Sequence, residues 1–136
     1  MLSLLAWNPV QRWHLPSIEA DGRREPRVLF SRPEARAVLI DLNAGDEMGD
    51  HRTHEQAMLE VVSGRVEVSS GTTRAECGAG TLVSLDPGET RSVRALEASR
   101  ILLVLAPWPG EGHFPAGESA DPLHMPALAA VPPLDP

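Results

Sequence analysis

The spacing of short runs rich in Val, Leu and Ile constrains the fold of this chain more than any other feature of its sequence. The runs are separated by turn signals about every 8 to 12 residues, which is typical of an all-β sandwich or barrel. Helix-capping signals followed by an apolar 3.6-residue period are missing, so the sequence predicts very little helix. The predicted strands are 27–30, 35–42, 57–63, 65–69, 72–77, 81–85, 90–96 and 99–105.

Glycine marks the tightest predicted turns. Ser63-Gly64 and Ser70-Gly71 are each expected to close a hairpin, because glycine readily adopts the positive φ that such turns need. Asp86-Pro87-Gly88 predicts a further turn, in which proline fixes the first central position and glycine takes the second.

Alternation of apolar and polar side chains predicts the buried face of each strand. Residues two apart in a strand share a face, so apolar residues at every second position indicate the side that packs in the core. The same reasoning gives Cys77 a buried, structural role, because a free buried cysteine usually just packs. The residues expected to point inward in two of the strands are Ala57, Leu59, Val61, Arg91, Val93 and Ala95.

The segment 101–105, with the sequence ILLVL, is apolar on both faces. One face is expected to pack inside the barrel, and the other under an N-terminal arm, a C-terminal tail or a second subunit. This two-faced strand is one reason to predict a homodimer.

The chain divides into an arm (1–25), a strand-rich body (26–106) and a Pro/Gly-rich extension (107–136), within a length that suits one domain. Eight of the 13 prolines lie in the extension, which excludes long helices and central strands there. The extension either wraps around the body or is disordered. Its apolar anchors for wrapping would be Trp108, Phe114, Leu123 and Met125.

Composition excludes several functions. The formal net charge is −7, with 19 acidic residues against 12 arginines and no lysine, so nucleic acid and anionic membrane surfaces are not expected partners. No apolar run approaches the roughly 18 residues of a membrane span. The single cysteine cannot form an internal disulfide, so nothing in the sequence indicates an oxidising compartment. The first residues do not resemble a signal peptide either, and we therefore expect a cytoplasmic location.

Two segments, 45–64 and 80–95, resemble the paired motifs of the cupin superfamily. The first motif reads Gly, five residues, His-x-His, three or four residues, Glu or Gln, six residues, Gly. The second reads Gly, five residues, Pro-x-Gly, two residues, His. The matching positions in this sequence are Gly45, His51, Gly64, Gly80 and Gly88, with Pro87 shifted by one place. The resemblance implies a small, single-domain, all-β cupin-like double-stranded β-helix, or jelly-roll barrel, and the family's habit of pairing barrels again favours a homodimer.

The resemblance also implies where a metal would bind. The four ligand positions of the family fall on His51, Thr53, Ala57 and Arg91, and only His51 is a normal transition-metal ligand. A guanidinium stays protonated and opposes a divalent cation. We therefore predict a barrel with degenerate metal motifs, no metal and no cofactor.

An inward-facing Arg91 needs an anion, because an unpaired buried charge is costly. One hypothesis is that Arg91 binds the carboxylate or phosphate of a small molecule inside the barrel. The alternative is structural: Arg91 pairs with an internal carboxylate such as Asp46 or Asp50, or reaches the barrel mouth. The predicted ligand-binding residues are His51, Thr53, Ala57, Leu59, Arg91 and Val93.

Two other functions stay open at this point, and so does the question of whether the protein is an enzyme. The first is a cupin oxygenase, isomerase or epimerase, which would use a nonstandard metal site at His51 and His54 or use His51 as general base. The second is a regulatory or protein-interaction barrel, whose termini would dock onto another protein.

Overall fold

The computed structural model describes residues 10–20, 25–51, 53–111 and 130–134, with only the backbone at 50 and 51. Nine strands make up almost all of its regular structure, together with one short 3-10 helix, η1 (Leu15–Ser17). The strands are β1 (Arg27–Ser31), β2 (Arg36–Leu42), β3 (Glu47–His51), β4 (Gln56–Ser63), β5 (Arg65–Ser70), β6 (Thr73–Gly78), β7 (Leu82–Leu85), β8 (Arg91–Ala95) and β9 (Ser99–Ala106).

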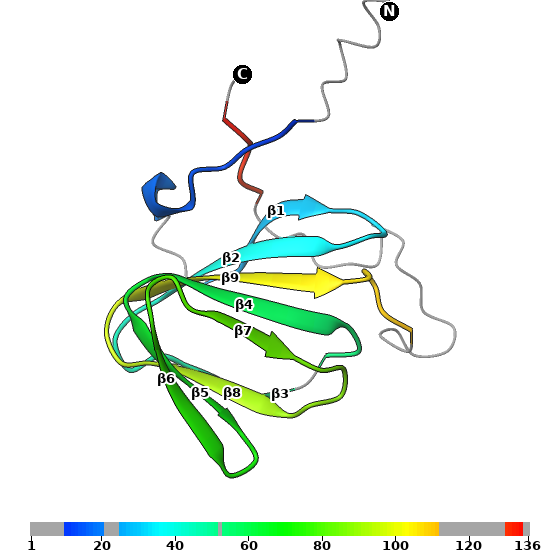
Figure 1. Cartoon of the computed structure of the whole chain (residues 1–136). Coiled ribbons are helices and arrows are strands. Elements are labelled where there is room, and N and C mark those ends of the chain that lie inside the picture. The colour runs from blue at the N-terminus through cyan, green and yellow to red at the C-terminus, as the bar shows by residue number, and fades with distance from the viewer. Residues whose placement is uncertain (1–9, 21–24, 52, 112–129, 135–136) are drawn as a thin grey trace, which may run out of the picture.

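The strands form two antiparallel sheets that pack face to face (Figure 1). One sheet has the order β1-β2-β9-β4-β7 and the other β3-β8-β5-β6. Because β2 and β3, β4 and β5, and β8 and β9 each belong to different sheets, the chain crosses between the layers at these turns. This crossing pattern is that of a jelly-roll barrel.

The eight strands expected from the sequence are all present, and no bound differs by more than one residue. The sequence missed β3, an edge strand that pairs only with β8 in the four-stranded sheet. Met48 is its only apolar residue, and a glycine and acidic residues surround it. Such a segment has low β-propensity, so its pairing depends on β8 rather than on its own composition.

Gly64 and Gly71 differ in the kind of turn that they make. Gly71 (φ +59°) closes the hairpin between β5 and β6, as expected. The expectation for Gly64 (φ +84°) was wrong, because β4 and β5 belong to different sheets and do not pair. Gly64 therefore makes a corner between the two layers. A Cβ there would lie 2.4 Å from the carbonyl oxygen of Ala98, so the corner has no room for a side chain.

The core lies between the inward faces of the two sheets, and the alternation expected for β4 and β8 is confirmed. In β6 the burial follows the alternation only in part. Cys77 is buried, but Ala75 is exposed although it lies on the same face. Because β6 is the edge strand of its sheet, only its C-terminal end, at Cys77, reaches the core. The central residues of the core are Ala57, Leu59, Val61, Val66, Val93, Ala95 and Ile101.

The outer face of the five-stranded sheet is covered in part by the chain itself. Leu39 lies on this face, because it alternates with Val38 and Ile40 of the core, and yet it is 0 % exposed. Residues 10–20 and 130–134 lie on this side of the molecule (Figure 1). They therefore provide part of the cover that the two-faced sequence of β9 predicted.

An ion cluster centred on Asp41 holds the arm against the sheet. The Asp41 carboxylate accepts two hydrogen bonds from Arg100 (2.7 and 3.1 Å) and one from Arg27 (3.0 Å). The two guanidinium groups also donate to arm carbonyls, Arg100 to Leu15 (2.8 Å) and Arg27 to Glu19 (2.7 Å). A single carboxylate thus orients two cations that bind the arm.

The last described residues are tied to the arm and to the sheet edge. Val131 N–H donates to the carbonyl of Val28 in β1 (2.9 Å), and the Trp13 indole donates to the carbonyl of Val131 (2.9 Å). These contacts support wrapping for 130–134, whereas the predicted anchors Phe114, Leu123 and Met125 lie outside the described residues. None of the helices in the described ranges is long and apolar enough to cross a bilayer.

Candidate functional site

Arg91 is the first residue of β8 and points into the barrel. Its residue is 2 % exposed, and the alternation Arg91, Val93, Ala95 places it on the inward face. Arg91 Nη1 donates to Thr53 Oγ1 at 3.3 Å, and Nη2 is buried with no hydrogen-bond partner in the described structure. The guanidinium therefore has only one long hydrogen bond.

Glu55 is a buried acid of the same region. Its residue is 0 % exposed, and its Oε2 accepts a hydrogen bond from Gly110 N–H at 2.7 Å. Glu55 was not among the residues predicted for the site. The signal that would have found it is the period of two, which extends the inward face of β4 from Ala57 back to Glu55.

Burial lowers the pKa of the Arg91 guanidinium below its usual value, and the negative charges of Glu89 and Glu55 offset part of this effect. Glu89 lies on the turn before β8. Hydrogen bonds from Ser70 Oγ (2.8 Å) and Asp86 N–H (3.0 Å), and then the charge of Arg91, lower the pKa of the Glu89 carboxyl. The negative charges of Glu55 and Glu89 thus favour the charged form of Arg91, although both carboxylates form their hydrogen bonds with other residues.

The structure brings together some of the predicted ligand-binding residues. Thr53 contacts Arg91 directly, and the backbone of His51 pairs with that of Arg91 between β3 and β8. The side chain of His51 lies outside the described residues, and His54 is exposed. The other three predicted residues, Ala57, Leu59 and Val93, are packed in the hydrophobic core.

The described residues at the family's metal positions do not fit a divalent cation. Ala57 has no donor atom and is fully buried, and Arg91 brings a positive charge. The Thr53 hydroxyl donates to the carbonyl of Glu55 (2.9 Å) and accepts from Arg91. Among the side chains that the structure describes, no group of three or more His, Cys, Asp or Glu could hold a metal ion.

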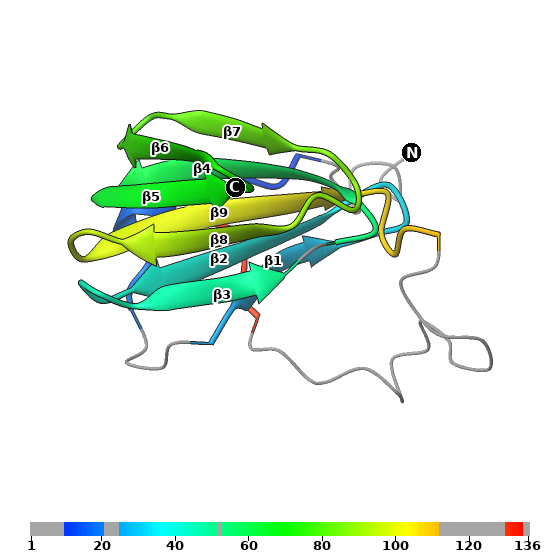
Figure 2. The same ribbon diagram turned by 90° about the horizontal axis from the view of Figure 1, so that it is seen from below.

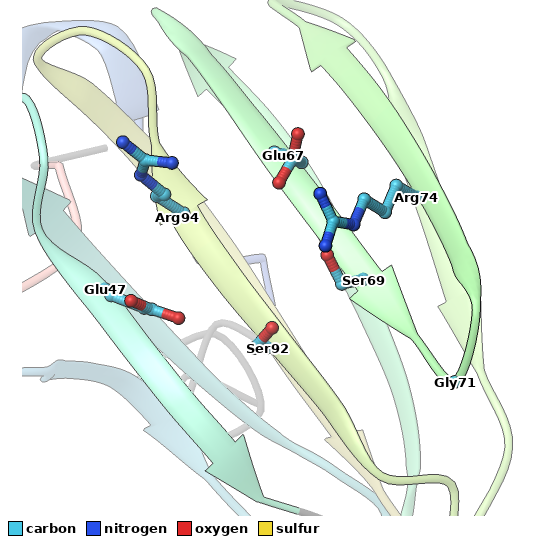
Figure 3. A pocket seen from close by; sticks show the side chains of 7 residues that line it. All are labelled: Glu47, Glu67, Ser69, Gly71, Arg74, Ser92 and Arg94. Carbon is cyan, nitrogen blue, oxygen red and sulfur yellow. The ribbon is translucent and has the colours of Figure 1, made fainter.

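Two surface hollows lie away from these residues. One, of about 370 Å³, lies on the outer face of the four-stranded sheet (Figure 3). It is polar, and neighbouring strands alternate acidic and basic side chains there. Its lining is Glu47, Glu67, Ser69, Gly71, Arg74, Ser92 and Arg94. A second, of about 310 Å³, is more apolar and lies between β2 and β3, where Ile40, Leu42 and Met48 line it.

The arrangement of the sheets identifies the class of fold as a double-stranded β-helix, and solved structures agree. An RmlC-like cupin protein from Desulfovibrio desulfuricans matches with a TM-score of 0.64 and 19% identity, over 72% of this chain and 97% of that one. KdgF from Halomonas sp. matches with a TM-score of 0.62 and 17% identity, over 72% and 94%. The Cnp3 cupin domain of Schizosaccharomyces pombe matches with a TM-score of 0.61 and 21% identity, over 70% of this chain and 72% of that one.

The chain therefore has the cupin fold, as its two motifs indicated. No protein-family model matches the sequence, and no curated protein does so either. At these identities the likeness extends to the fold alone, so function has to be argued from the residues of this chain.

Proposed function

We propose that the protein is a metal-independent cupin barrel that binds a small molecule, and that Arg91 holds an acidic group of this ligand. The observation that carries the proposal is that Arg91 is 2 % exposed and that its guanidinium makes a single hydrogen bond, of 3.3 Å, with the residues that the structure describes. Removing such a charge from water costs several kcal/mol, even after local relaxation. A carboxylate or phosphate that binds both ends of the guanidinium would offset this cost.

Internal pairing is the competing explanation, and the nearby acids argue against it. In the described part of the chain no acidic oxygen lies within 4.0 Å of the Arg91 guanidinium. Glu55 binds the amide of Gly110, and Glu89 binds Ser70 and the amide of Asp86. Asp46, one of the two expected partners, accepts a hydrogen bond from the amide of Asn43, and the side chain of Asp50, the other, lies outside the described residues. These contacts leave Arg91 Nη2 for a ligand.

Calorimetric titration with sodium acetate and with inorganic phosphate tests the proposal. We expect Arg91→Gln to weaken the binding of the tighter of these two anions by about tenfold to a hundredfold, the range of a charge-assisted hydrogen bond. Arg94→Gln is the matched control, because Arg94 lies on the same strand but is exposed on the outer face. Equal affinities for the wild type and Arg91→Gln, or no binding of either anion, would overturn the proposal.

Metal analysis of the purified protein separates this function from the enzymatic alternative. Near-stoichiometric iron, manganese, nickel or zinc that disappears in His51→Ala would contradict a metal-independent barrel.

The homodimer is a separate expectation, which light scattering at micromolar concentration tests. A pull-down with and without residues 107–136 tests the protein-interaction alternative.

A further inference from the structure

A second arginine, Arg36, also points into the barrel. It is the first residue of β2, and it shares a face with Val38 and Ile40, which belong to the core cluster. Its partner across the sheet is Leu105 of β9, another core residue. Arg36 is 8 % exposed, so its charge is buried among apolar side chains.

The charge of Arg36 has very little compensation. Its guanidinium carbon lies 4.6 Å from the ring centroid of Trp108, and it makes no hydrogen bond or ion pair with any residue that the structure describes. The Nε atom is buried with no partner, and burial lowers the pKa of the group. A cation–π contact recovers only part of the cost of burying a guanidinium.

Arg36 and Arg91 lie at the same end of the barrel. In the five-stranded sheet, Arg36 pairs with Leu105, and Leu105 pairs with Ala57 of β4. Four residues before Ala57, at the start of the same segment, Thr53 contacts Arg91. Figure 2 shows the same relation, because β9 ends and β8 begins on one side of the molecule, where β2, antiparallel to β9, also begins.

One short segment lies across this end and contacts the surroundings of both arginines. Trp108 packs against Arg36, and two residues later the Gly110 amide donates to Glu55, whose charge acts on Arg91. The two arginines come from opposite sheets, which pack about 10 Å apart. Two long side chains that point inward from such sheets can reach a single small ligand.

We propose that the ligand carries two acidic groups, one bound by Arg91 and the other by Arg36, as in a short dicarboxylate. This inference rests on the proposed function and adds the second charge. Because each guanidinium has free donors in a buried setting, each can bind one carboxylate with charge-assisted hydrogen bonds. Linking the two carboxylates in one molecule makes the second contact nearly intramolecular, so the gain in affinity is large.

The test compares pairs of acids of equal carbon number by calorimetric titration: succinate with butyrate, and glutarate with valerate. We expect at least one dicarboxylate to bind the wild-type protein about tenfold or more tightly than its partner monocarboxylate. Arg36→Gln should reduce this ratio to about two or less and leave the monocarboxylate affinity within about threefold. Arg91→Gln should weaken both acids, and Arg94→Gln should change neither.

The outcomes separate the two proposals. If monocarboxylate binding depends on Arg91 but the dicarboxylate has no advantage, or keeps its advantage in Arg36→Gln, the second contact is wrong and the proposed function stands. If Arg91→Gln leaves every affinity unchanged, or if neither these acids nor inorganic phosphate binds the wild type, both are wrong. If phosphate binds through Arg91 but none of the acids does, the dicarboxylate is wrong and the proposed function stands. Arg36→Lys guards against a folding defect, because it keeps the charge and should retain part of the dicarboxylate advantage.

Discussion

Replacing Gly64 by alanine tests the packing of the corner between the two sheets. Gly64 has a φ of +84°, and a Cβ at this position would lie 2.3 Å from Ser99 Oγ, 2.4 Å from the Ala98 carbonyl oxygen and 2.7 Å from Ser99 Cα. Two of these three atoms belong to the backbone. The substitution therefore cannot be accommodated by rotating one side chain.

Two costs add up in Gly64→Ala. A positive φ costs a non-glycine residue about 1 to 2 kcal/mol, and forcing an extra carbon into a filled space costs about 1 to 3 kcal/mol. Moving Ser99 would also strain its hydrogen bonds, since Ser99 Oγ accepts from Arg65 N–H (2.9 Å) and donates to the Glu97 carbonyl (2.7 Å). We expect Gly64→Ala to lower the free energy of unfolding by about 3 kcal/mol.

Gly71→Ala is the matched control. Gly71 also has a positive φ (+59°), but a Cβ there would meet no atom within 4 Å. Its cost should be the conformational part alone, about 1 kcal/mol. Urea unfolding followed by far-UV circular dichroism measures both variants, and the expected gap of about 2 kcal/mol corresponds to roughly 6 to 10 °C in Tm. Equal destabilisation of the two variants would refute the close approach at Gly64.

Three further outcomes follow from the charges. Asp41→Ala should lower the free energy of unfolding by about 3 kcal/mol, because it leaves the largely buried Arg27 and Arg100 without their carboxylate. Glu76→Ala, which removes an exposed ion pair, should cost less than about 1 kcal/mol in the same urea assay, and a similar loss in both would contradict the cluster. The lowered pKa of Glu89 means that wild type should be more stable than Glu89→Gln at pH 7. This gap should shrink as the pH falls below the ordinary carboxyl value of 4.5 and through the lowered pKa. A Tm difference that stays constant from pH 7 to pH 3 would exclude this contribution.

The fold was predictable where alternation is clean and local. Strands such as β4 and β8 carry their own pattern, so their faces could be assigned from sequence. The corner at Gly64 could not be distinguished from a hairpin, because the same two residues suit both and only the packing of the sheets decides. Strand β3 could not be found, because its pairing with β8 is long-range and its own sequence combines two acidic residues with a glycine.

The site was predictable only where motif spacing pointed to a residue. Arg91 was identified because it occupies the position of a family histidine, and its burial agrees with that. Arg36 was missed because nothing local distinguishes it from the other arginines, and its burial depends on Trp108, which is 72 residues further along the chain. Glu55 was missed because the motif directed attention to Ala57, although alternation would have placed both on one face.

The hydrogen bonds between residues 10–20 and 130–134 have a consequence for local unfolding of the protein. Trp13 donates to a carbonyl 118 positions away, and the Leu134 amide donates to the carbonyl of Arg12 at 2.8 Å. Residues 10–20 and 130–134 thus form hydrogen bonds with each other. If one stretch detached alone, polar groups of the other would lose their hydrogen-bond partners. Amide exchange in 10–20 and 130–134 should accordingly follow a shared time course, as expected of one cooperative unit.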